Sequence, residues 1–219
     1  MAGTQKLARK SLAVQVADAL REMILSGDFE QGEQLRQDDI AQRLGVSRIP
    51  LREAYQQLEA EGLVVNVPYK GTIVSRLSTD EITEYFDIRA TLEAELLSAA
   101  IDQLDADVIA EARKLAEQMN TSSPAKRGEL NWQMHEVLYQ EANRPITLEM
   151  VKKIHDNLDR YVRIQLSLSD ANRDRANEEH GRLITLCEQR RKNEAVGLLK
   201  DHIAGARDDL IAYLRDHDK

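Results

Sequence analysis

Three histidines and one asparagine in the second half of the chain have the types and the spacing of a metal site. Asn131 and His135 are four residues apart, so a helix would place both on one side. His180 and His202 each lie in line with apolar residues of their own segments, which would turn both imidazoles inward. Three imidazoles from three helices could hold a divalent ion, with the carbonyl oxygen of Asn131 as a further ligand and one position open.

The same residues also fit a simpler interpretation, in which each histidine is a core residue whose hydrogen bonds are satisfied. His155 also faces inward among apolar neighbours, which shows how easily the pattern arises. Spacing alone favours the core interpretation and leaves the metal site as an open alternative.

The segment that must position these residues is helical in its periodicity from residue 78 onward. Ser78 and Glu81 form a capping box, in which each side chain can bond the backbone amide of the other, so a helix should begin there. Five later breaks divide the rest of the segment and predict about six helices. The breaks fall near Leu104-Asp105, Thr121-Ser122-Ser123-Pro124, Arg144-Pro145, Ser169-Asp170 and Lys192-Asn193.

The beginning of the chain predicts three shorter helices. Apolar residues recur at three- and four-residue spacing from Leu12, and Ser26-Gly27-Asp28 should end that helix. A second helix is predicted over 37–44, and Ser47 could cap a third. Two short helices joined through a tight turn match the helix-turn-helix plan.

Beyond the third helix the composition changes to β-branched residues. The segments 63–67 and 72–75 predict two strands joined as a hairpin. We place the domain boundary at residue 77, with a winged helix-turn-helix over 1–77 and a helical domain over 78–219. The predicted fold is therefore mainly α.

The third helix has one side suited to a core and another suited to DNA. Its apolar arc consists of Leu51, Ala54, Tyr55 and Leu58. Ile49, Arg52, Glu53 and Gln56 fall outside this arc, with Arg48 at its edge. Arginine can bind a guanine edge or a phosphate with two parallel hydrogen bonds, and glutamine can bind adenine. The hairpin tip at Lys70 and Gly71 could follow the backbone or the minor groove, although helix-turn-helix geometry also occurs as plain packing.

Charge and cysteine content set limits on these interpretations. The net charge of −8 disfavours DNA, but residues 1–77 hold ten basic and ten acidic side chains, so the whole excess of acid lies in the second part. Cys187 is the only cysteine and cannot form an intrachain disulfide, which suits a reducing cytoplasm. No run of about 18 apolar residues is present, so no membrane-spanning helix is predicted.

The first part of the chain resembles the GntR family of transcription regulators. The resemblance covers residues 11–76 and rests on GEQL at 32–35, IAQRLGVSRIPLREA at 40–54, LEAEGLV at 58–64 and the wing residue Gly71. It implies that Arg48 and Arg52 make the principal contacts to double-stranded operator DNA, assisted by Arg43 and the wing pair Lys70-Gly71. Tyr55 replaces the usual leucine, and the acidic Asp38 and Asp39 stand where some relatives carry arginine.

The second part resembles the FCD ligand-binding domain of the FadR subfamily. This resemblance covers residues 80–216 and rests on RATLE at 89–93, NWQMH at 131–135, and the pairs Glu179-His180 and Asp201-His202. It implies an antiparallel all-α bundle with a ligand cavity, and the count of about six helices points to the VanR-like branch.

The FCD resemblance also implies a metal and an effector. Metal-binding members use an Asp or Asn and three histidines, which correspond here to Asn131, His135, His180 and His202, with Zn as the favoured ion and Ni or Mn as alternatives. Effectors of the family are mostly small carboxylates. Arg89 could pair with such a carboxylate, and the alternative for Arg89 is a structural ion pair with Glu93, four residues on.

These observations together favour a ligand-responsive transcription regulator. A homodimer would hold two winged helices at half-site spacing, and a carboxylate bound in the bundle would release the repressor from DNA. A hydrolase that uses the three-histidine site is the main alternative, but no general base stands beside the ligands and Glu136 would face away. A DNA binder without a ligand is a third interpretation. We therefore expect no enzymatic activity.

Overall fold

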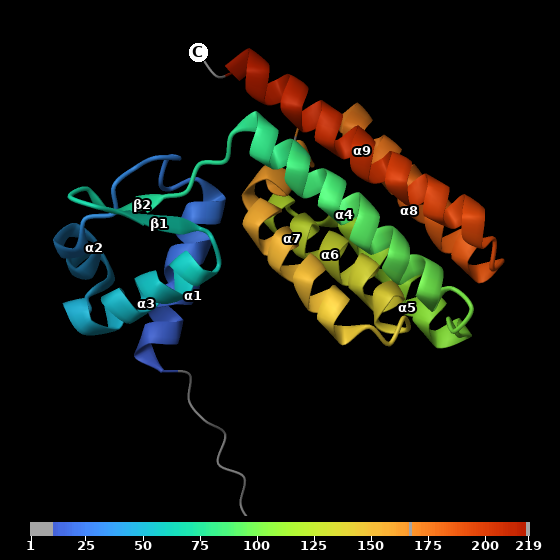
Figure 1. Cartoon of the computed structure of the whole chain (residues 1–219), viewed down its shortest axis with the longest axis horizontal. Helices are drawn as coiled ribbons and strands as arrows, with labels where there is room; N and C mark the ends of the chain where they lie inside the picture. The colour runs from blue at the N-terminus through green and yellow to red at the C-terminus, as the bar shows by residue number, and fades with distance from the viewer. Residues whose placement is uncertain (1–10, 167, 218–219) are drawn as a thin grey trace, which may run out of the picture. The chain divides into compact units, whose positions relative to one another are not determined.

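The chain folds into two compact units, and the boundary between them falls between Arg76 and Leu77. The structure is a computed structural model that describes residues 11–166 and 168–217. Over these residues it contains nine α-helices and one two-stranded sheet (Figure 1), which confirms the prediction of a mainly α fold. Each unit has a hydrophobic core of its own, and each is described here by itself.

The first unit is a winged helix-turn-helix. Its elements are α1 (Leu12–Ser26), α2 (Gln37–Leu44), α3 (Arg48–Ala60), β1 (Val64–Val67) and β2 (Gly71–Val74). Helix α1 ends at Gly27, whose φ of +88° is a left-handed conformation that glycine adopts without a steric penalty. The backbone amide of Gly27 bonds back to carbonyls of the last turn, as the predicted stop at this residue requires.

The turn between α2 and α3 depends on Gly45 more than on Ser47. Gly45 ends α2 with a φ of +66°. Ser47 occupies the residue before α3, but its side chain makes no capping hydrogen bond, so the prediction that this hydroxyl caps the helix is wrong. The backbone conformation of Ser47 is extended, as it is at most helix starts, and it sets the direction of α3 without that bond.

The apolar arc of α3 packs into the core as its spacing predicts. Leu51, Ala54 and Leu58 are fully buried, and Tyr55 is 5% exposed. The Tyr55 hydroxyl donates a 3.2 Å hydrogen bond to the carbonyl of Leu35. This bond explains how the core accepts a tyrosine, because a buried hydroxyl without a partner would be destabilising.

The hairpin forms the wing of this unit. Strands β1 and β2 pair antiparallel with Val64 opposite Val74 and Val67 opposite Gly71. The strands lie within one residue of their predicted ends. Tyr69 and Gly71 at the tip both have positive φ, +65° and +77°, which makes the turn tight.

The second unit consists of six helices over its described residues, which agrees with the predicted number. They are α4 (Thr79–Ala100), α5 (Ala106–Thr121), α6 (Pro124–Gln140), α7 (Pro145–Gln165), α8 (Asp170–Glu188) and α9 (Lys192–His217). The predicted capping box starts α4, since the Glu81 amide donates to the Ser78 hydroxyl at 3.2 Å and the Ser78 amide donates to the Glu81 carboxylate at 2.8 Å. Asp105 and Ser169 cap α5 and α8 through their side chains.

Helix α4 is central to the packing of this bundle. It packs against α6, α7 and α9, while α5 packs against α6 and α8, and α8 against α9. Figure 1 shows α4 and α9 side by side along the bundle. The facing sides of α4, α6, α8 and α9 therefore meet in one interior. Among the described residues, no helix is both long and apolar enough to cross a membrane.

Candidate metal centre and nucleic-acid interface

Helices α6, α8 and α9 bring three histidines together inside the bundle. One ring nitrogen from each of His135, His180 and His202 lies within 4.8 Å of the others. Their ring centroids are 4.7 to 5.9 Å apart. His135 and His180 are buried, and the His202 side chain is 13% exposed. The three predicted imidazole ligands thus converge from three separate helices.

His180 tests whether this cluster suits a metal. Both of its ring nitrogens are buried and neither has a hydrogen-bond partner among the described residues. A core histidine normally has at least one nitrogen satisfied, because leaving a buried polar group unpaired costs about 1–3 kcal/mol. A divalent ion between the three rings would give one of these nitrogens a partner, so the donor set fits such an ion.

The other two histidines each use their outer nitrogen in a hydrogen bond. His202 Nδ1 lies 2.6 Å from the carboxylate of Glu179 on α8. His135 Nδ1 lies 3.2 Å from the hydroxyl of Tyr139, one turn further along α6. The nitrogen that remains for a metal on each of these rings is therefore Nε2.

Burial keeps the rings of His135 and His180 in their neutral form. Burial is the main cause that lowers the pKa of both His135 and His180 well below the ordinary value for histidine. The neighbouring imidazoles lower the pKa of His135 further. Neutral imidazole is the form that binds a metal, because protonation occupies the lone pair that the metal needs.

Two further predicted site residues lie in the same interior. Asn131 is buried on α6, one turn before His135. Arg89 is buried on α4, where its Nε donates a 2.7 Å hydrogen bond to Glu93. The ion pair that we kept as the alternative for Arg89 is therefore present, and it occupies Nε.

Two buried ring nitrogens near this site have no role assigned by the sequence, in which His155 served only as an example of an inward-facing histidine. His155 on α7 and Trp132 on α6 have rings with centroids 4.9 Å apart. The Trp132 Nε1 and the His155 Nε2 are buried without partners among the described residues. An inward position on a helix is visible in sequence, but the loss of a hydrogen-bond partner depends on tertiary packing and is not.

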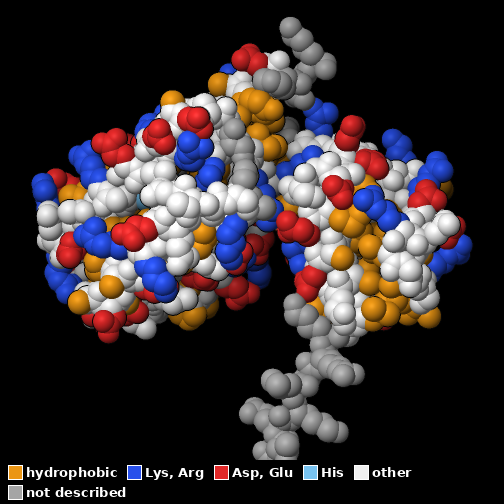
Figure 2. Space-filling view, turned by 180° about the vertical axis from the view of Figure 1, so that it is seen from behind, with side chains coloured by type: hydrophobic (Ala, Val, Ile, Leu, Met, Phe, Trp, Pro, Cys, Tyr) orange, Lys and Arg blue, Asp and Glu red, His pale blue; other side chains and the backbone are white. Residues whose placement is uncertain are grey.

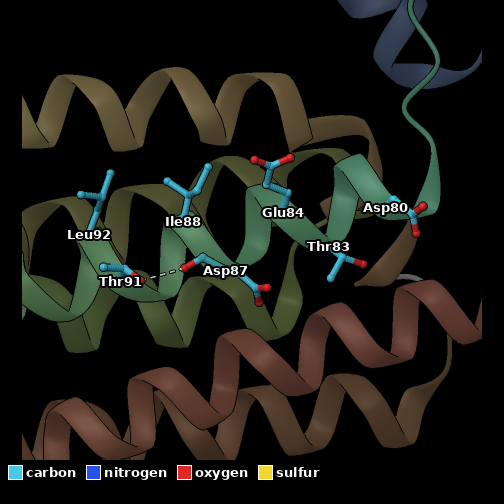
Figure 3. Close-up of a pocket in the computed structure, with 7 residues that line it drawn as sticks. All are labelled: Asp80, Thr83, Glu84, Asp87, Ile88, Thr91 and Leu92. Atoms are coloured by element: carbon cyan, nitrogen blue, oxygen red, sulfur yellow. Dashed lines mark hydrogen bonds between the residues drawn. The ribbon is translucent and has the colours of Figure 1, made fainter.

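A separate groove lies on the outer side of α4. It has a volume of about 540 Å³ and is lined by side chains that include Asp80, Asp87, Ile88 and Leu92 (Figure 3). Helix α4 turns Arg89 and Glu93 to its buried side, so none of the predicted metal or effector residues lines this groove.

The residues predicted to contact DNA are all exposed on the first unit. They are Arg43, Arg48, Arg52, Gln56, Lys70 and Gly71. Arg52 and Gln56 line a polar hollow of about 250 Å³ that α2, α3 and the hairpin enclose. Figure 2 shows basic and acidic side chains intermixed on the visible faces of both units.

Two of these arginines have acidic partners. Arg48 lies 2.5 Å from Asp38, and Arg43 lies 3.2 Å from Asp28. All four side chains are about half exposed or more, so water and salt screen the pairs strongly. A phosphate could exchange with either carboxylate, and Asp38, which stands where some relatives carry arginine, would compete with it for Arg48.

Ile49 is the residue of this surface whose role sequence analysis did not assign. It is the second residue of α3 and 72% exposed. An apolar side chain at the exposed N-terminal end of a helix-turn-helix reading helix is suited to contact with a thymine methyl group. Its position outside the apolar arc was the signal that could have identified it.

Comparison with known proteins matches each unit to a protein family. The family described as "Bacterial regulatory proteins, gntR family" matches residues 12–74, and the FCD domain matches residues 84–205. A solved transcriptional regulator of the GntR family from Pseudomonas syringae pv. tomato str. DC3000 is 30% identical, with a TM-score of 0.59 over 94% of this chain and 87% of that one. The chain is a GntR-family regulator with an FCD domain.

Curated relatives of this regulator carry names of the same kind. The uncharacterized HTH-type transcriptional regulator YdhC of Bacillus subtilis (strain 168) is 26% identical over 87% of this chain and 85% of its own length. The HTH-type transcriptional repressor GlaR of Escherichia coli (strain K12) is 42% identical over 44% of this chain and 46% of its own length. Family membership makes this protein a DNA-binding transcription regulator rather than an enzyme, and the hydrolase alternative has no support.

Proposed function

We propose that the regulator is a repressor that binds operator DNA. It would dissociate from the DNA when a small carboxylate binds beside a metal ion in the second unit. The observation that carries the proposal is His180, whose two nitrogens are buried and unpartnered between His135 and His202. These three imidazoles and the carbonyl oxygen of Asn131 would hold the ion. When bound, the ion supplies a Lewis acid with an open position for an anionic oxygen.

The effector would be positioned by residues of α4 as well. The ion pair of Arg89 with Glu93 uses Nε, so the terminal amino groups of its guanidinium are suited to a carboxylate. Arg89 is also linked to His135 by hydrogen bonds through Glu93 and Tyr139. A carboxylate held between Arg89 and the ion would have both of its oxygens bound.

The first unit would read the operator as half of a homodimer. Arg48, Arg52 and Gln56 on α3 would contact base edges and phosphates, and Arg43 with the Lys70-Gly71 wing would contact the backbone. Two such units at half-site spacing would bind a palindromic duplex. Effector binding in the bundle would favour a dimer arrangement with a different spacing, which lowers affinity for DNA.

Repression and the branch of the family are proposals of the same kind. The relative GlaR is named a repressor, as is the gluconate operon regulator of Bacillus licheniformis, which is 32% identical over 69% of this chain. Six helices in the second unit favour the VanR-like branch.

The test begins with the metal. Protein purified without chelator is analysed for metal content by mass spectrometry, and we expect about one zinc, nickel or manganese ion per chain. A duplex selected from a random pool is then titrated with the metal-loaded protein in the presence of small carboxylates. We expect one class of carboxylate to weaken binding, and to do so only when metal is present. Metal-free protein that responds equally to the carboxylate contradicts the proposal.

A further inference from the structure

We propose that Glu179, and Glu93 acting through Tyr139, are positioning residues that hold the imidazole proton of His202 and of His135 on Nδ1. The inference rests on the proposed metal site. It assigns roles to Glu179, Glu93 and Tyr139, none of which belongs to the proposed ligand set. A neutral imidazole carries one proton, so a proton fixed on the outer nitrogen leaves the lone pair of Nε2 facing the other rings.

The pair of His202 and Glu179 determines the first proton. Nδ1 lies 2.6 Å from a carboxylate oxygen, and an ionised carboxylate can only accept a hydrogen bond. Arg175 lies 3.7 Å from the other oxygen of the same carboxylate. Because the carboxylate accepts at this distance, the Nδ1 of His202 is the donor.

A longer chain of bonds determines the second proton. The Tyr139 hydroxyl donates its one hydrogen to Glu93 at 2.8 Å. The contact of 3.2 Å between the same oxygen and the Nδ1 of His135 then needs its hydrogen from the imidazole. Glu93 is 1% exposed and accepts a 2.7 Å hydrogen bond from the Nε of Arg89 on its other oxygen, so both of its oxygens are acceptors of buried donors.

His180 differs from both neighbours, because neither of its nitrogens has a partner. The rings of His202 and His135 are thus held by hydrogen bonds at Nδ1, and the ring of His180 is held by packing alone. Without the fixed protons, a ring could present an N–H group to the ion, and metal binding would then require the loss of that hydrogen or a rotation of the ring. Partners of this outer kind commonly change metal affinity by about 10- to 100-fold.

The first experiment reads the proton positions directly and needs no variant. Imidazole nitrogen chemical shifts of the metal-free protein, recorded by NMR with ¹⁵N-labelled histidine, distinguish a protonated Nδ1 from a protonated Nε2. We expect a protonated Nδ1 for His135 and His202. A protonated Nε2 on either ring overturns the assignment for that ring, whether or not the protein binds a metal.

The second experiment measures zinc affinity by competition with a chromophoric chelator. Glu179→Ala and Tyr139→Phe should each weaken zinc binding by about 10- to 100-fold, and Glu179→Gln should weaken it less, because its amide oxygen still accepts the hydrogen bond. The d–d spectrum of bound cobalt(II) should change in Glu179→Ala, whereas a purely structural role would leave it unaltered.

The matched control is Glu188→Ala, which removes a glutamate from the same helix. Glu188 pairs with Arg113 at 2.6 Å on the surface, and we expect zinc affinity equal to that of the wild type. Wild-type protein that binds no zinc overturns the metal function itself. Wild-type protein that binds zinc, together with variants within twofold of it, overturns only the positioning roles.

Discussion

The surface of α3 proposed to contact DNA (Arg48, Ile49, Arg52 and Gln56; the reading face) and the cluster of His135, His180 and His202 (the histidine centre) differ in how exposed their side chains are. Arg48 is 67% exposed and its partner Asp38 69%, whereas Arg89 and Glu93 are 6% and 1% exposed. DNA is a large partner, so its contacts must project into water before binding. The proposed metal ion and small acid would be enclosed, so their contacts must be buried and incompletely satisfied before binding.

The difference predicts how each region couples function to stability. Substitution of an exposed arginine changes affinity for DNA and changes the free energy of unfolding little. The histidine centre includes buried nitrogens without partners and rings with a lowered pKa, so the metal-free fold carries a cost there. Function in the bundle should therefore be visible in unfolding measurements, and function on α3 should not.

Acidification of the metal-free protein should produce the largest effect. Burial lowers the pKa of His135, His155 and His180 in the folded state below the unfolded value of about 6.5. The unfolded state therefore binds more protons at acid pH, so the stability present above pH 6.5 is lost as pH falls. Between pH 7.5 and pH 5.5 each histidine contributes about 1.4 kcal/mol, or about 4 kcal/mol for the three together.

The measurement is urea unfolding of chelated protein at pH 7.5, 6.5 and 5.5. The variant His155→Phe should show a smaller loss, because one of the three depressed groups is gone. A free energy of unfolding that stays constant over this range contradicts the prediction.

Removal of the metal should have the next largest effect. An ion that binds only the folded state stabilises it by about 4 kcal/mol when its free concentration is a thousand times Kd. His180→Leu should abolish this gain and leave the chelated protein at least as stable as chelated wild type, because the unpartnered nitrogens are replaced by an apolar side chain of similar volume. Calorimetry with and without zinc compares the two proteins, and a His180→Leu variant that zinc still stabilises contradicts the assignment.

The comparison also shows what the sequence could and could not predict. Local signals sufficed for the bounds of α2, the capping box of α4 and the inward direction of the three histidines, because helical periodicity and capping depend on neighbours a few residues away. They failed for the link from Tyr139 to Glu93, since that bond joins residues 46 positions apart in the sequence. They also failed for the Ser47 side chain, whose backbone has the conformation of a helix start although its hydroxyl makes no capping bond.

Arg89 also shows that local sequence cannot predict a tertiary contact. Its spacing from Glu93 allowed both an ion pair and an effector contact, and the structure contains the ion pair without removing the second possibility. Only packing decides which atoms of a guanidinium are used. Sequence therefore identified the side chain, and the structure identified the atom.

Loss of the Arg52 side chain should have a smaller effect, confined to DNA binding. Arg52→Ala should weaken binding to a selected duplex by about 1–3 kcal/mol if it contacts a base edge, and the free energy of unfolding should change by less than about 0.5 kcal/mol. Arg113→Ala is the control, since it removes the same charge from the second unit. A shift assay at fixed salt compares them, and equal affinities for all three proteins contradict a role for Arg52.

Loss of the Ile49 side chain should have the smallest effect on affinity for DNA, and that effect should be confined to one thymine per half-site. A thymine methyl group buried against its exposed side chain is worth about 0.8 kcal/mol, or about fourfold in affinity. Replacement of each thymine in the selected duplex by deoxyuridine removes only that methyl group. We expect one thymine per half-site at which wild type loses about fourfold and Ile49→Ala loses much less, because the variant has no side chain there to bury the methyl.

This result would separate contact from mere exposure. Arg52→Ala should keep the preference for thymine over deoxyuridine at the same position, since its contact is polar and independent of the methyl group. Wild-type affinity that is unchanged by every deoxyuridine would mean that Ile49 projects into solvent beside the DNA. The exposed Ile49 side chain would then need a partner other than DNA to explain it. The contrast between the reading face and the histidine centre would also lose its best single-residue test.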